Sequence, residues 1–382
     1  MDDIPYYRDM KIGRRRFLKS LALAGAIATM GFSGCISSPE PTPAQTPEVT
    51  PEKVEEHGLD KEPLIEGSIW DPDEFVGLTE EQQYRMEMVN EIKAFALGLG
   101  FSETENFKRY VDELDAYHYY FYTPVISLPY GLGDPELRFG VGKPEDVVID
   151  LDEYDVFFFS IEAVAGVKTP VTRTLIEAPL SRFIHVVFHE EWHEQIDLPL
   201  VIEEPNAEVV SHIASMLFAE KKLGPCSEEY NALNRQWENK LRESAVYVDH
   251  YHQLETLYCQ FHAKELSRSE TLRLKDGILE SLGEGIEDIW GARPEQLNNA
   301  IIAFQMTYYR HLSLMHQVFL ALNSDLKRTI ALFLAMPRQG EDATSLDEIN
   351  DIEADVIGYL EDVLAERSSE AVRTASARYG AD

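Results

Sequence analysis

The chain has 382 residues, of which 44% are hydrophobic, so it is long and apolar enough for one large or two modest globular domains. Its formal net charge is -34, because 68 Asp and Glu residues outnumber 34 Lys and Arg residues. This charge excludes nucleic acid and anionic lipid surfaces as partners held by bulk electrostatic attraction.

Residues 1–35 have the features of an export signal rather than of a folded segment. Three consecutive arginines at 14–16 precede an apolar run over 21–32, which is typical of a twin-arginine signal for proteins exported already folded. Small residues before Cys35 resemble a lipobox, so Cys35 is the expected lipidation site. We expect a lipoprotein held by its lipid at the outer face of the cytoplasmic membrane, either periplasmic or extracellular. A plain signal peptide and an uncleaved membrane anchor are the alternatives.

The composition then divides the chain into a linker, a domain and a tail. Residues 36–62 are rich in Pro, Thr and Glu, which predicts an extended linker without a core of its own. One folded domain is expected over 63–366, followed by a flexible tail over 367–382. The predicted elements of this domain indicate an α+β fold that is predominantly α-helical, with a small β-sheet and a C-terminal helical region.

The first elements of the domain carry local signals. Thr79 and Gln82 have capping-box spacing, which predicts a helix that begins there and ends near Gly100. A second helix is expected over 103–114. Aromatic and β-branched residues predict strands over 118–128, 147–149 and 154–160.

The segment His189-Glu190-Glu191-Trp192-His193 is an H-E-x-x-H pattern. On a helix its two histidines lie one turn apart on the same face, so both imidazoles can reach one metal ion. Glu190 lies beside them, where it can polarise a metal-bound water. The alternative is a solvated Glu/His face with a core histidine. His185, one turn earlier, is expected to be structural.

A catalytic zinc site of this kind needs a third protein ligand, for which the segment 202–212 offers candidates. Glu204 and Glu208 are four residues apart on one helix face, so either could bind the metal. Glu203 is expected to be a solvated carboxylate. His212 is either an outer partner of the site or an ordinary histidine on a helix face.

Helices dominate the rest of the chain. One is expected to have Pro205 in its first turn and to run to about Lys222. Cys226 and Cys259 either form a disulfide or remain two free thiols. Further helices are expected over 227–263, 266–282, 294–322, 324–336 and 347–366.

Several segments together resemble a bacterial family of predicted zinc aminopeptidases. They include 170–175, the H-E-x-x-H helix, Glu204-Pro-Asn-Ala207 and 297–308, and the resemblance extends over about 85–335. Members typically carry an Asn-Glu-x-x-Ala segment after the metal helix, and Glu204 occupies its glutamate position. The resemblance therefore favours Glu204 over Glu208 as the third ligand. This chain has Glu191-Trp192 where small or aliphatic residues are usual.

The resemblance implies a zincin-like core and a zinc-dependent metallopeptidase that acts on peptides outside the cytoplasm, with aminopeptidase activity expected. Its zinc ligands would be His189, His193 and Glu204. Glu190 would be the general base, and Tyr308, or else Tyr309, would donate a hydrogen bond to the oxyanion. The alternative is a membrane-anchored binding lipoprotein on a catalytically inactive metallopeptidase fold. The presence of Glu190 favours the enzyme.

Overall fold

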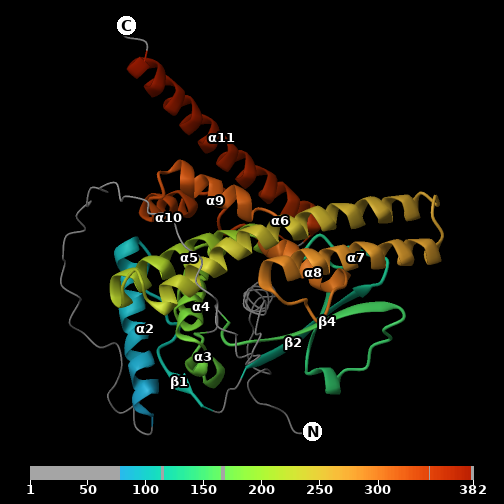
Figure 1. The fold of residues 1–382 in the computed structure, drawn as a ribbon, viewed down its shortest axis with the longest axis horizontal. Coiled ribbons are helices and arrows are strands. Elements are labelled where there is room, and N and C mark those ends of the chain that lie inside the picture. Colours follow the sequence, from blue (N-terminus) through green and yellow to red (C-terminus); the bar gives the residue numbers. More distant parts are fainter. Residues whose placement is uncertain (1–77, 113–115, 165–167, 344, 380–382) are drawn as a thin grey trace, which may run out of the picture.

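The computed structural model describes residues 78–112, 116–164, 168–343 and 345–379. This part of the chain is mostly helical with a small antiparallel sheet, which confirms the α+β, mainly α-helical class (Figure 1). The export signal, Cys35 and the linker lie outside the described residues, so the expectations about them stay predictions.

The first helix, α2 (Glu80–Leu99), begins with the predicted capping box and ends at Gly100, which has φ 111°. The helix predicted over 103–114 is wrong. The described part of that segment is irregular and ends in β1 (Tyr110–Val111), which pairs in parallel with β5 (Val171–Thr172). The Lys93 ammonium of α2 binds the carbonyl oxygens of Thr104 and Asn106, and these contacts hold the segment in a non-helical path.

The sheet has the order β3-β2-β4 and is antiparallel. Its strands are β2 (Tyr117–Pro124), β3 (Arg138–Val141) and β4 (Tyr154–Ile161). Two of the predicted strands are confirmed as β2 and β4. The strand predicted over 147–149 is wrong: the segment follows the 3-10 turn η3 (Pro144–Asp146), and Val148 is fully exposed. The four-residue strand β3 was not predicted.

One face of the sheet packs on a helix through aromatic rings. The Phe304 ring of α8 lies 5.2–5.7 Å, between centroids, from the rings of Phe121, Phe157 and Phe159. Gly140 of β3 is required opposite Tyr120, because a Cβ atom at this position would overlap the tyrosine ring. The ring contacts of Phe304 hold the sheet against the helical part of the domain.

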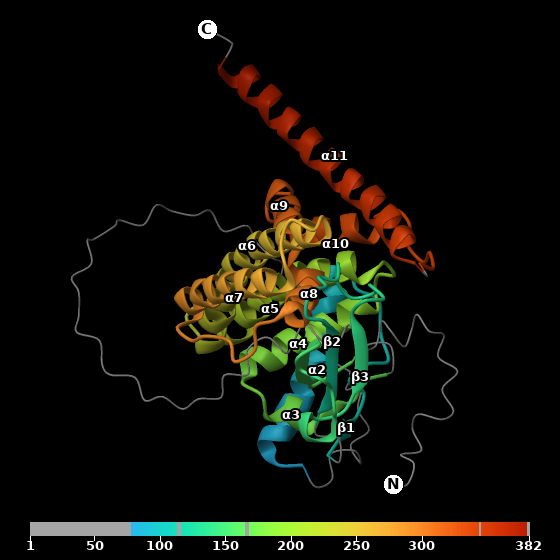
Figure 2. The same cartoon turned by 90° about the vertical axis from the view of Figure 1, so that its right-hand side faces the viewer.

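Helices make up the rest of the domain. They are α3 (Arg173–Glu177), α4 (Leu180–His193), α5 (Leu200–Leu223), α6 (Glu228–His262), α7 (Arg268–Trp290), α8 (Asn299–Tyr309), α9 (Leu312–Ala321), α10 (Leu326–Leu334) and α11 (Leu346–Tyr379). The hairpin of α4 and α5 lies at the centre and contacts α2, α6 and α8 (Figures 1 and 2). Helices α6 and α7 lie side by side, and α11 projects from the body.

Several helix boundaries differ from the sequence predictions; α7, expected to end at 282, continues to Trp290, and α8, expected from 294, begins at Asn299. Helix α5 begins at Leu200, directly after Pro199, so Pro205 lies in its second turn rather than its first. The predicted helix over 294–322 is two helices, because His311 leaves the helical conformation with φ -112° and ψ 6°. Helix α11 extends to Tyr379, well into the segment expected to be a flexible tail.

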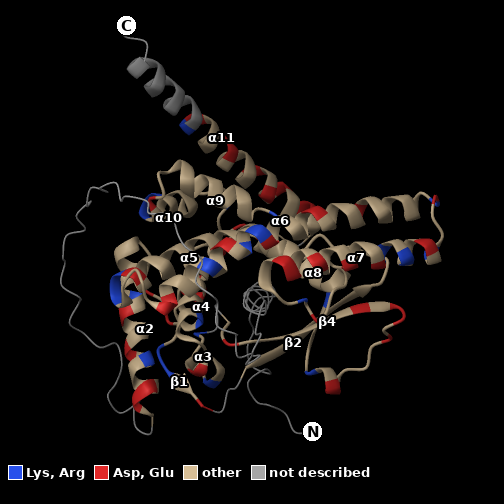
Figure 3. Cartoon of the chain, viewed as in Figure 1, with Lys and Arg blue, Asp and Glu red and all other residues tan. Residues whose placement is uncertain are grey.

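The surface of the described part reflects the composition. Acidic side chains are spread along α2, α7 and α11 (Figure 3). Cys226 and Cys259 are free, exposed thiols, which is one of the two alternatives left open by the sequence. Among the described residues, no helix combines the length and the apolar character needed to cross a bilayer.

Candidate metal centre

Two rows of side chains of the kinds that can bind metals face each other inside the α4–α5 hairpin. The connection over 194–199 is short, so the two helices run antiparallel as neighbours. Each row has four-residue spacing, which places its members on one helix face. The rows are His185, His189 and His193 on α4, and Glu204, Glu208 and His212 on α5, and all six side chains are buried.

The structure brings His189, His193 and Glu204 together, as the sequence and the resemblance predicted. The two histidine Nε2 atoms are 2.9 Å apart, and each lies 3.4 Å from Oε2 of Glu204. Zinc bonds to nitrogen and oxygen of about 2.0–2.1 Å place the corners of a tetrahedron about 3.3 Å apart. The three atoms therefore have the separations of three corners of a zinc tetrahedron, and they fit a metal ion.

Glu203 orients one of these histidines, which corrects the expectation that it is a solvated carboxylate. It is fully buried, and its Oε1 lies 2.9 Å from Nδ1 of His193. Its Oε2 accepts a hydrogen bond from the Leu198 amide. An ionised carboxylate can only accept, so we assign the His193 proton to Nδ1. This leaves the Nε2 lone pair directed at His189 and Glu204, where a cation would stabilise it.

Burial keeps the ligand histidine His189 neutral. Its pKa is lowered well below the usual value, first by desolvation and then by the nearby His193. The pKa of Glu204 is raised well above its usual value by desolvation, followed by the charges of Glu203 and Glu190. Neutral imidazoles are the form that binds metal.

Glu190 and Tyr308, the two predicted catalytic side chains, are both buried in the same region as the first group. Glu190 is fully buried next to His189 in the sequence of α4, and its charge is among the causes that raise the pKa values of Glu204 and Tyr308, after burial. The Tyr308 hydroxyl lies beside the Glu204 carboxylate, and burial is the main reason that the pKa of Tyr308 is raised. Tyr309, the alternative to Tyr308, points elsewhere and donates a hydrogen bond to Glu243.

The two residues at which the metal helix departs from the resembled family hold it in place. Glu191 forms a buried ion pair with Lys93 of α2 at 2.8 Å and accepts hydrogen bonds from Thr104 Oγ1. Trp192 Nε1 donates a 2.8 Å hydrogen bond to Asn206 of α5. The sequence analysis missed these partners. The available signal was a lysine on the apolar face of α2.

The centre holds more buried carboxyl groups than buried ammonium groups. Glu190, Glu203, Glu204 and Glu208 are all 0% exposed, and Lys240 of α6 pairs with Glu208 at 2.7 Å. Buried carboxylates are costly unless positive charge compensates them. A divalent cation is therefore the kind of ligand that this arrangement favours.

Glu208, the alternative third ligand, belongs to a different group. It lies with His185 and His212, and one potential ligand atom from each is within 4.8 Å of the others. These three residues share no member with the first group.

Comparisons with known proteins add no family to this picture. The chain matches no protein-family model, no curated protein and no solved structure. The resemblance to predicted zinc aminopeptidases therefore stays a prediction from the sequence.

Proposed function

We propose that this chain is a zinc-dependent metallopeptidase with a zincin-like core and, following the resemblance, an aminopeptidase. One observation carries the proposal. His189, His193 and Glu204 offer three atoms with tetrahedral separations, and Glu190 lies close to them. Three protein ligands with a neighbouring carboxylate are the donor set of hydrolytic zinc sites.

Each residue has a role in the proposed reaction. Zinc at this site would supply a Lewis acid that lowers the pKa of water and polarises the peptide carbonyl. Glu190 takes a proton from the attacking water and gives it to the leaving amine. Tyr308 donates a hydrogen bond to the oxyanion. Glu203 keeps His193 in the tautomer and orientation in which it binds metal.

Burial of the centre constrains how a substrate could enter. Glu190 and Glu204 are 0% exposed, His193 is 5% exposed and Tyr308 is 1% exposed. A peptide therefore reaches these side chains only if part of the surrounding structure moves. The same observation favours the second candidate, a binding lipoprotein that retains the metal centre without catalysis.

The decisive experiment compares the wild type with Glu190→Gln after zinc loading, using peptides with free and with blocked amino termini. We expect equal zinc content and an activity about 10²–10⁴-fold lower in the variant. Preference for free amino termini would support an aminopeptidase, and equal cleavage of both peptides an endopeptidase. Unchanged hydrolysis in Glu190→Gln would contradict the mechanism, and a zinc-loaded but inactive wild type would favour the binding lipoprotein.

The cellular setting remains part of the proposal. Export by the twin-arginine route and a lipid on Cys35 would place the domain outside the cytoplasm, with peptides rather than nucleic acid as partners. Cys35→Ala should move the protein from the membrane fraction to the soluble fraction. Unchanged membrane association would contradict the lipid anchor.

A further inference from the structure

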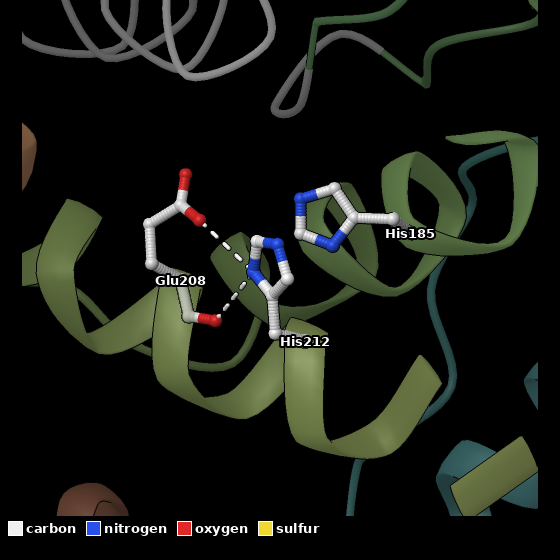
Figure 4. A group of neighbouring side chains, drawn as sticks. All are labelled: His185, Glu208 and His212. Carbon is white, nitrogen blue, oxygen red and sulfur yellow. Dashed lines mark hydrogen bonds and ion pairs between the residues drawn. The ribbon is translucent and has the colours of Figure 1, made fainter. Parts of the chain in front are cut away.

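A second cluster of potential ligands lies in the same helix hairpin, farther from the 194–199 connection than the first group (Figure 4). His185 belongs to α4, and Glu208 and His212 belong to α5. The imidazoles of His185 and His212 face each other, with ring centroids 3.9 Å apart. The indole of Trp237 packs on the His212 ring at 5.1 Å. Exposure of all three cluster residues is 6% or less.

The hydrogen bonds of this cluster leave electron pairs available. His212 Nδ1 donates a 3.1 Å hydrogen bond to the backbone oxygen of Glu208 and lies 3.1 Å from Oε2 of the same residue, so its Nε2 carries the lone pair. Among the described residues, Nδ1 of His185 and Oε1 of Glu208 have no hydrogen-bond partner. Buried polar atoms without partners are rare in folded proteins, and a bound cation would give both of these atoms a partner.

The charge of the centre leaves room for a second cation. When metal binding ionises Glu204, four buried carboxylates face the ammonium of Lys240, the one ammonium described next to them, so a single divalent ion at the first group leaves a net negative charge. Lys240 binds Oε2 of Glu208, so Oε1 stays available for a second ligand bond. Two imidazoles and one carboxylate are a donor set for divalent transition metals such as zinc and cobalt.

We propose that His185, Glu208 and His212 bind a second divalent transition-metal ion. The nearest members of the two groups, His185 and His189, have ring centroids 5.7 Å apart, and the groups have separate ligands, so two ions can bind at once. The second ion would join α4 to α5, because His185 belongs to α4 and Glu208 and His212 belong to α5. This inference needs no peptidase activity, and its three ligands are separate from those of the first group, but its charge argument counts the buried carboxylates of both groups.

The test is the metal content of the purified full chain, stripped with a chelator and reconstituted with Zn²⁺ or with Co²⁺. We expect two ions per chain in the wild type and one in His212→Phe and in His193→Phe. His250→Phe is the matched control and should keep two ions, because His250 is a buried histidine that contacts Val246 and Ser281 outside both groups. Equal metal content in the wild type and His212→Phe would overturn the second site.

If His212→Phe does not fold, two further variants test whether the second site binds a metal ion. Glu208→Gln keeps the size of the side chain and should bind one ion; two ions would contradict the proposal. Lys240→Met removes the competing ammonium and should tighten binding of the second ion by at least about tenfold. An unchanged second affinity would indicate that Glu208, His212 and Lys240 form only a buried ion-pair network.

The two metal groups can fail independently. Loss of one ion in His193→Phe with none lost in His212→Phe would remove the second site and leave the proposed function standing. The reverse pattern would remove the first group and leave the second. The absorption spectra of the cobalt-loaded variants provide a further readout. His193→Phe should show the spectrum of the second site only, and His212→Phe that of the first group only.

Discussion

Glu203 provides a quantitative test of how the metal centre is built. Its carboxylate is fully buried and holds Nδ1 of His193 at 2.9 Å. Loss of such an outer partner of a metal ligand costs about 10–100-fold in metal affinity. Glu203→Gln retains an acceptor oxygen without the charge, so we expect a loss of about tenfold, or about 1.4 kcal/mol. Glu203→Leu loses both and should approach 100-fold, or about 2.7 kcal/mol.

The assay is zinc competition against a chromophoric chelator of known affinity, with folding of each variant checked by circular dichroism. Glu220→Gln is the control, because Glu220 is an exposed glutamate of the same helix. It should bind zinc as the wild type does. If Glu203→Leu also binds zinc with wild-type affinity, Glu203 does not orient His193 in the metal-bound protein and the reasoning is refuted.

Three other substitutions test the stability and chemistry of the centre. Lys93→Met leaves Glu191 buried without its ion-pair partner, so the free energy of unfolding should fall by about 3–5 kcal/mol. Urea titrations measure this change, and a loss below about 1 kcal/mol would contradict the prediction. Burial raises the pKa of Glu243 to about 7, so its ionisation destabilises the fold as pH rises through the interval between its unfolded and folded pKa values. Glu243→Gln should therefore gain stability over the wild type between pH 5 and pH 8, by up to about 3 kcal/mol, and a pH-independent difference would count against this. Tyr308→Phe should retain zinc and lower kcat by about 10²–10³-fold with little change in KM, whereas an unchanged kcat would remove Tyr308 from the mechanism.

The first metal group could be predicted because its geometry is local. His189 and His193 are one turn apart on a single helix, and the resemblance selected Glu204 from the next helix. The role of Glu203 could not be predicted in the same way. A helix with Pro205 in its first turn leaves Glu203 near the start of the helix, where a solvated carboxylate is expected, whereas α5 begins at Leu200 and buries Glu203 against His193.

The remaining errors have a common physical origin in contacts between distant parts of the chain. The segment around Thr104 has helix-like local features, but Lys93 and Glu191 bind it in an irregular conformation. His185 and His212 lie on different helices, and their rings meet because of the register in which α4 and α5 pack. This register cannot be read from the sequence of either helix alone. Periodicity therefore found most of the helices, whereas the polar contacts between elements required the structure.

Anomalous diffraction at the zinc edge, from crystals of the zinc-reconstituted protein, tests the central claim most directly. We predict a zinc peak about 2.0–2.2 Å from Nε2 of His189, Nε2 of His193 and a carboxylate oxygen of Glu204, with Glu190 beside it. A structure with no peak between these three side chains, and with the two imidazoles still in direct contact, would contradict the metal centre and the function built on it.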